Sequence, residues 1–133
     1  MNVRRTSLTA LLACAIVVPP VAAQEESEAP AGTAKAYDKR LMRLSEVLGS
    51  LHFLRPLCGR DANGEWRKAM SDILEVEKPN EQRRALLISR FNRGYETFRR
   101  SYRSCTPSAV RAANRYRLEG VRLTAQIVAR HAR

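Results

Sequence analysis

Four stretches of the chain place apolar residues at the three- and four-residue spacing that puts them on one side of an α-helix. We expect helices over residues 36–55, 65–77 and 80–104, and a fourth that begins after Thr106. No segment alternates apolar and polar residues as a half-buried strand would. The pattern therefore predicts an all-α domain of four helices.

Each expected helix carries its own apolar stripe, which would face a shared core. The stripe residues are Tyr37, Leu41, Leu44, Leu48 and Leu51; Trp66, Met70, Ile73 and Leu74; Leu87, Phe91, Tyr95, Phe98 and Tyr102; and Ala109, Ala113, Tyr116, Gly120, Leu123 and Ile127. Short loops between such helices favour an up-down bundle.

Prolines and turn residues separate the stripes. Pro56 should end or kink the first helix, because the residue before a proline avoids the α region. Thr106 is a good N-cap and Pro107 suits the first position of a helix. The short corner between the last two helices predicts an antiparallel hairpin with Phe91 opposite Gly120, where the glycine would allow close packing.

The first 36 residues differ from the rest of the chain. Residues 1–23 have a basic start, a short apolar run and small residues before Gln24, so they predict a signal peptide cleaved after Ala23 and a periplasmic location. Residues 24–36 predict a flexible, disordered linker, and residues 37–131 the helical domain. Lipidation at Cys14 is a minor alternative, which would make the protein a lipoprotein.

Two cysteines, Cys58 and Cys105, follow the expected ends of the first and third helices. Those ends lie together in an up-down bundle, and exported chains of this size often carry disulfides. We therefore predict that one disulfide joins the pair. A redox-active pair is the less favoured reading, because that chemistry usually uses a Cys-x-x-Cys spacing.

Positive charge is concentrated in the C-terminal part of the chain. The whole sequence has a formal charge of +11, and residues 79–133 hold thirteen arginines against three glutamates, a balance of +10. Some arginines lie opposite the apolar stripes of the last two helices, together with one leucine. These candidate residues for an anionic partner are Arg93, Arg100, Arg103, Arg111, Arg115, Leu118 and Arg122. A merely solvated face, with Glu96 pairing to Arg93 and Arg100, is the alternative.

Residues that could support catalysis are sparse. No cluster of histidine, cysteine and acidic residues has the spacing of a zinc site, and no phosphate-binding or dinucleotide-binding glycine motif occurs, so we expect no metal and no cofactor. Asp61 and Glu65 lie near one turn, and His52 lies at the edge of the first apolar stripe; a site built from these residues leaves an envelope hydrolase open as an alternative. The sequence favours a protein that is not an enzyme.

The leading hypothesis is a non-enzymatic envelope accessory or binding protein. Its partner would be a lipid headgroup, an anionic cell-wall polymer or an acidic periplasmic protein. Export makes nucleic acid an unexpected partner, although a basic helical domain would otherwise suggest one. A chaperone-like binder of unfolded exported proteins is a further alternative, and the sequence leaves the oligomeric state open.

Several separated blocks resemble a family of small exported alphaproteobacterial proteins that is catalogued as a domain of unknown function. The blocks are residues 48–59 (LGSLHFLRPLCG), 66–67 (WR), 91–95 (FNRGY) and 102–106 (YRSCT), with Met70 between them. The resemblance spans most of residues 36–128 and implies a periplasmic location. It implies no activity, so it assigns no catalytic residue.

Overall fold

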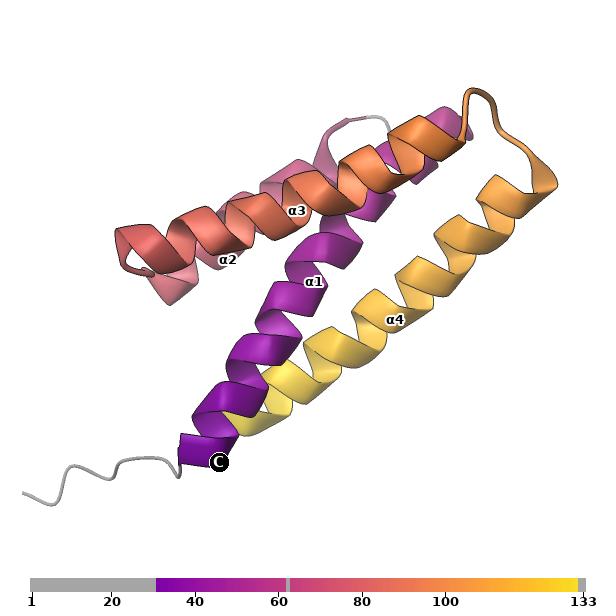
Figure 1. Cartoon of the computed structure of the whole chain (residues 1–133). Coiled ribbons are helices and arrows are strands. Elements are labelled where there is room, and N and C mark those ends of the chain that lie inside the picture. Colours follow the sequence, from indigo (N-terminus) through magenta and orange to yellow (C-terminus); the bar gives the residue numbers. More distant parts are fainter. Residues whose placement is uncertain (1–30, 62, 132–133) are drawn as a thin grey trace, which may run out of the picture.

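The computed structural model describes residues 31–61 and 63–131, which form four α-helices (Figure 1). Helix α1 spans Ala31–Leu57, α2 spans Glu65–Glu77, α3 spans Glu81–Ser101 and α4 spans Pro107–His131. There is no strand among the described residues. The prediction of an all-α, four-helix domain is confirmed.

The helix boundaries differ from those expected at three places. Helix α1 begins at Ala31, so it includes the last part of the predicted linker, and it continues through Pro56 to Leu57. Helix α3 ends at Ser101, three residues before the expected end. The predicted signal peptide, Cys14 and the first part of the linker lie outside the described residues.

Helix α1 is the hub of the domain, because α2, α3 and α4 each pack mainly against it. Figure 1 shows α3 crossing α1 obliquely, while α4 runs back beside α1 in the opposite direction. The predicted packing of α3 against α4 along their length is wrong: the two helices diverge from their corner. The reason is that α1 buries small and apolar residues around most of its circumference, which include Leu41, Leu48, Gly49, Ser50 and Leu54.

Two glycines allow α1 and α3 to cross with their backbones in contact. A Cβ atom on Gly49 would lie 1.8 Å from the carbonyl oxygen of Phe91, and one on Gly94 would lie 2.0 Å from that of Glu46. Any side chain at either position would collide with main chain. The expected close approach therefore exists, but it joins α3 to α1, whereas Gly120 of α4 faces the side chain of Val47 and not Phe91.

The buried hydroxyl groups of α1 are satisfied within their own helix. Ser45 Oγ donates to the carbonyl oxygen of Leu41 at 3.0 Å, and Ser50 Oγ donates to that of Glu46 at 2.8 Å. A buried hydroxyl without such a partner would be costly. Small residues can therefore line the helix interface without leaving polar atoms unpaired.

The core has two parts, a larger one along the middle of α1 and a smaller one at its C-terminal end. The larger part includes residues from all four helices: Leu41, Leu44, Val47, Leu48, Leu51, Met70, Leu74, Leu87, Phe91 and Leu123. The smaller part, near the corner between α3 and α4, contains Leu54, Phe98, Ala109, Ala112 and Ala113. There the rings of Phe98 and Tyr116 meet edge to face at a centroid distance of 5.0 Å, which links α3 to α4 close to their corner.

The disulfide lies at the same end of the molecule as the smaller part of the core. Cys58 and Cys105 are bonded, with their Cα atoms 4.9 Å apart, so the predicted pairing is confirmed. The C-terminal ends of α1 and α3 lie together (Figure 1), as the pairing requires. Thr106 caps α4 as expected: its Oγ1 accepts a hydrogen bond from the Ala109 amide at 3.1 Å.

Candidate binding surfaces

The arginines singled out in the sequence form two strips on the outer sides of different helices. Arg93 and Arg100 lie on α3 and Arg103 in the loop that follows, all of them exposed. The second strip lies on α4 and consists of Arg111, Arg115, Leu118 and Arg122, also exposed. Because α3 and α4 diverge (Figure 1), the strips approach each other only at the corner near Arg103.

Carboxylates neutralise the α3 strip only in part. Glu96 accepts two hydrogen bonds from Arg99 at 2.9 and 2.8 Å and lies 3.6 Å from Arg100, and the bonds from Arg99 lower its pKa. The expected pair with Arg100 is present, but Arg93 forms no ion pair among the described residues.

The acid of α4 points inward instead of pairing with the outer strip. Glu119 accepts hydrogen bonds from Nε and Nη2 of Arg43 on α1, at 2.7 and 3.0 Å. These bonds lower the pKa of Glu119, and the more distant Arg122 and Arg115 lower it a little further. In the described part of the chain, no carboxylate forms an ion pair with Arg111, Arg115 or Arg122, so this strip keeps its positive charge.

The three residues considered for hydrolysis have separate partners. Asp61 accepts a hydrogen bond from Arg55, which lowers its pKa, and Glu65 is the exposed first residue of α2. His52 lies against the rings of Phe91 and Tyr95, at centroid distances of 5.6 and 5.7 Å and tilted to them by 38° and 39°. No hydrogen bond or ion pair links any two of Asp61, Glu65 and His52 in the described structure.

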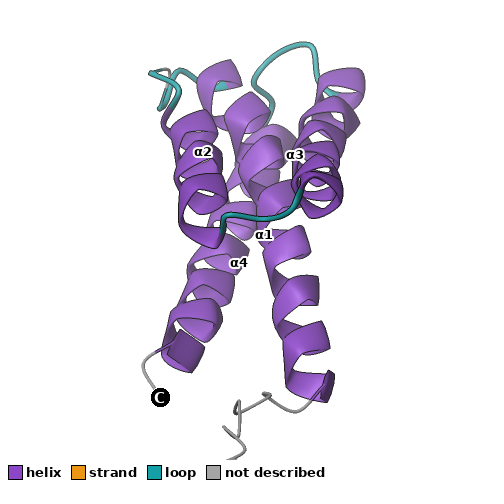
Figure 2. Cartoon of the chain, turned by 90° about the vertical axis from the view of Figure 1, so that its left-hand side faces the viewer, coloured by secondary structure: helices purple, strands orange, loops and turns teal. Residues whose placement is uncertain are grey.

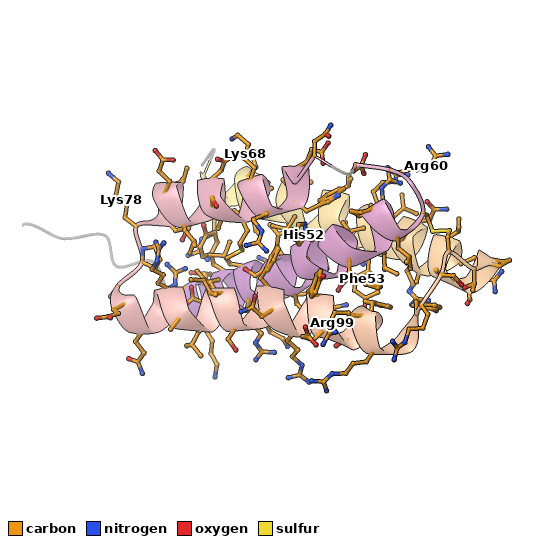
Figure 3. The ribbon with its side chains drawn as sticks, turned by 90° about the horizontal axis from the view of Figure 1, so that it is seen from above. His52, Phe53, Arg60, Lys68, Lys78 and Arg99 are labelled. Carbon is orange, nitrogen blue, oxygen red and sulfur yellow. A yellow bond between two sulfur atoms is a disulfide. The ribbon has the colours of Figure 1, made fainter. Side chains whose placement is uncertain are left out.

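His52 is held in a mostly apolar environment between α1 and α3 (Figure 3). Its Nδ1 atom is buried and has no hydrogen-bond partner within the described residues. Burial lowers the pKa of His52 below its usual value of 6.5, and the nearby positive charge of Arg67 adds to this. The imidazole is therefore neutral at pH 7 and acts here as a packing residue.

A groove that the sequence did not reveal lies between α2 and α4, with α1 as its floor. Its cavity has a volume of about 400 Å³. The lining is almost wholly apolar and comprises Tyr37, Leu41, Leu44, Leu48, Ala69, Ile73, Val76, Ile127 and Val128, with Asp72, Glu77 and Thr124 at the edges. We call it the α2–α4 groove. It exists because α2 and α4 both pack on α1 without packing on each other.

A polar network closes the end of this groove near the start of α1. Tyr37 donates a hydrogen bond to Glu77, and Arg83 lies 2.6 Å from Asp38 and 3.1 Å from Glu77. Burial, followed by the bond to Glu77, raises the pKa of Tyr37 to about 12. Tyr37 therefore keeps its proton at physiological pH, and the charges at this end are largely paired.

A second hollow lies at the disulfide end of the same side of the molecule. Its volume is about 470 Å³. Its lining residues are Leu54, Arg55, Cys58, Arg60, Cys105, Val110, Ala113, Asn114 and Arg117. No acidic side chain lines it, and of its three arginines only Arg55 has an ion-pair partner among the described residues. We call it the disulfide pocket.

The described residues contain neither a metal site nor a helix that could span a membrane. No group of three or more histidine, cysteine or acidic side chains is placed to hold a metal ion. None of the helices in the described ranges is both long enough and apolar enough to cross a membrane.

These features define a class: a small, basic, all-α domain with one disulfide, built on a central helix. The chain belongs to the family described as protein of unknown function (DUF2385), whose match covers residues 36–131. Neither a curated protein nor a solved structure matches the chain. The predicted membership in an uncharacterised family is thus confirmed, and the family brings no activity with it.

Proposed function

We propose that this protein is a non-enzymatic binding protein of the bacterial envelope that recognises an anionic component through its arginine strips. The observation that carries the proposal is the α4 strip. Arg111, Arg115 and Arg122 project from one side of a well-packed helix, and the nearest acid, Glu119, is bonded to Arg43 on the opposite side. The protein thus presents fixed positive charge at an exposed surface.

The chemistry of arginine narrows the class of partner. A guanidinium group binds phosphates and carboxylates through paired hydrogen bonds. Because it is more weakly hydrated than an ammonium group, its desolvation on binding costs less. Leu118, which is 60% exposed within the α4 strip, adds an apolar contact that a solvated face would not need. A membrane surface with anionic headgroups offers both kinds of contact, and export predicted from residues 1–23 would place the protein beside one.

Cosedimentation with lipid vesicles tests this proposal. The protein without residues 1–23 should sediment with vesicles that contain phosphatidylglycerol and not with phosphatidylcholine vesicles, and moderate salt should weaken the binding because it screens exposed charges. Cell-wall sacculi serve as a second anionic surface. No salt-sensitive retention on either surface would overturn the proposal.

A pair of matched variants locates the contact. R111E/R122E reverses two charges in the α4 strip and should remove most of the binding. K39E/R67E makes the same change in charge at exposed positions of α1 and α2 and should bind nearly as well as the unmodified protein. Equal losses in the two variants would show that net charge, and not the α4 strip, controls binding.

A further inference from the structure

The α2–α4 groove and the disulfide pocket lie along one side of α4. Arg117 lines the pocket, and Thr124 and Val128 line the groove. Val121 falls between them, so these four residues follow one another at spacings of four, three and four and share a face of the helix. At about 1.5 Å per residue, the stretch from Arg117 to Val128 is roughly 16 Å long.

The groove end of this face is apolar and open. Val76 of α2 is 79% exposed, Val121 and Val128 of α4 are 60% and 57% exposed, and Leu44 and Leu48 of α1 form the floor between them. Figure 2 shows α2 and the C-terminal half of α4 on the same side of the view, one above the other. Exposed apolar side chains gathered around a hollow indicate a ligand site more strongly than scattered ones do.

The pocket end of the same face is positively charged. Arg60 and Arg117 are exposed and form no ion pair among the described residues, whereas Arg55 forms an ion pair with Asp61. Figure 3 shows Arg60 at the disulfide end of the molecule, away from Lys78 at the far end of α2. An elongated ligand along this face would therefore meet apolar side chains at one end and arginines at the other.

We propose that this face binds a single acyl chain that carries an anionic headgroup. The chain lies in the α2–α4 groove, and its carboxylate or phosphate lies at the disulfide pocket near Arg117. The cavity volume is typical of small-molecule sites, which usually combine an apolar lining with a few polar groups that set the orientation. A second copy of this basic chain would bring like charge to the arginine end, which disfavours self-association there.

This inference is independent of the proposed function. Arg117 and Val128 belong to neither arginine strip, and one molecule bound in a groove differs from adhesion to a surface. The R111E/R122E variant should leave acyl-chain binding intact. Failure of acyl-chain binding would therefore leave the proposal of adhesion to an anionic surface standing, and failure of surface adhesion would leave the acyl-chain proposal standing.

Calorimetric titration with dodecanoate, kept below its micelle concentration, tests the inference. We expect saturable binding with one site. Dodecyltrimethylammonium has the same chain and the opposite charge, so it should bind much more weakly. A lysophosphatidylglycerol with the same chain distinguishes a phosphate headgroup from a carboxylate, and binding of either anionic ligand supports the proposal. No saturable binding of the two anionic ligands overturns it, even if an unfolded polypeptide binds instead.

Two matched pairs of variants assign the two ends of the face. V128Q places an amide in the groove and should weaken dodecanoate binding about tenfold, because it replaces an apolar contact of a few methylene groups. L86Q makes the same kind of change at an exposed position of α3 outside the groove and should have little effect. R117E should abolish the preference for the anionic over the cationic ligand, whereas R122E should retain it. Equal effects within either pair would overturn the assignment of that end.

Discussion

The two sides of α1 are built on opposite principles. Toward α3, the helices touch through their backbones, with Gly49 and Gly94 leaving no room for a side chain. Toward α4 and α2, the helices touch through side chains, which include the Arg43–Glu119 pair and apolar residues of the core. The α2–α4 groove remains open on this side. The comparison teaches that the α1–α3 crossing fixes the fold, while the α4 side retains the exposed charge and apolar surface from which a binding site can be made.

The largest effect should come from filling the glycine crossing. In G49A/G94A, each added methyl group would overlap a carbonyl oxygen, so α1 and α3 must separate. Overpacking costs about 3 kcal/mol per site at the upper end of its usual range, so two sites would consume most of the stability of a small domain. Thermal or urea unfolding followed by circular dichroism measures the loss.

Gly120 provides the control for this prediction on the other side of α1. A Cβ atom there would lie 3.3 Å from Cγ1 of Val47, a tight contact with a side-chain atom that needs a shift of only a few tenths of an ångström, and not a collision with main chain. The alanine also improves helix propensity by about 1 kcal/mol. G120A should therefore stay within about 1 kcal/mol of the unmodified protein. If it unfolds as readily as G49A/G94A, the proposed difference between the two sides is wrong.

The next largest effect should follow removal of the disulfide. C58S/C105S releases a loop closed over 47 residues, which in the chain-entropy model costs roughly 4 kcal/mol. Urea unfolding of the variant and of the parent, each with and without reductant, measures this loss. The reductant should lower the parent to the level of the variant and leave the variant unchanged. Any vesicle binding should survive at low temperature, where the variant remains folded.

The smallest effect should come from the Arg43–Glu119 pair. E119Q removes the charge but keeps the shape, and because both side chains are partly exposed, the expected cost is about 1 kcal/mol. Glu119 has a lower pKa in the folded state, so its contribution is fully present above the ordinary value of 4.5 and is lost as the pH falls through the folded-state pKa. Unfolding free energies measured from pH 6 to pH 3 should therefore converge for E119Q and its parent.

One outcome would contradict this prediction. If the difference between E119Q and its parent persists unchanged at pH 3, the ion pair does not account for it. E96Q is a useful comparison, because Glu96 forms similar bonds to Arg99 within a single helix and links no two parts of the core. It should change stability less than E119Q at neutral pH.

The sequence predicted the elements better than their arrangement. Helical spacing identified all four helices, and the caps and prolines placed most of their ends, because these are local properties. The expected pairing of α3 with α4 is wrong because the corner at Thr106 favours a hairpin, whereas α3 packs on α1 at Gly49. Its pairing with Gly94 depends on two residues that are 45 positions apart, and one sequence carries no direct sign of that.

The candidate surfaces show the same division. The exposure of the arginines could be predicted from their position opposite each apolar stripe. Their separation into two strips follows from the angle between α3 and α4, which spacing does not encode. The α2–α4 groove could not be predicted for a related reason. Val121 and Val128 lie at the edge of the α4 stripe, and they are exposed only because α2 does not pack against that edge of α4.

The hydrogen bonds between Arg130 and Thr33 show that the described chain starts and finishes at one place. Helix α1 is 27 residues long, so the disulfide corner lies roughly 40 Å from that place. A tag, surface anchor or fluorescent label attached directly at residue 31 or residue 131 would therefore stand clear of the corner arginines. The same proximity makes the domain suitable for circular permutation, in which a short linker joins the two ends and new termini open elsewhere.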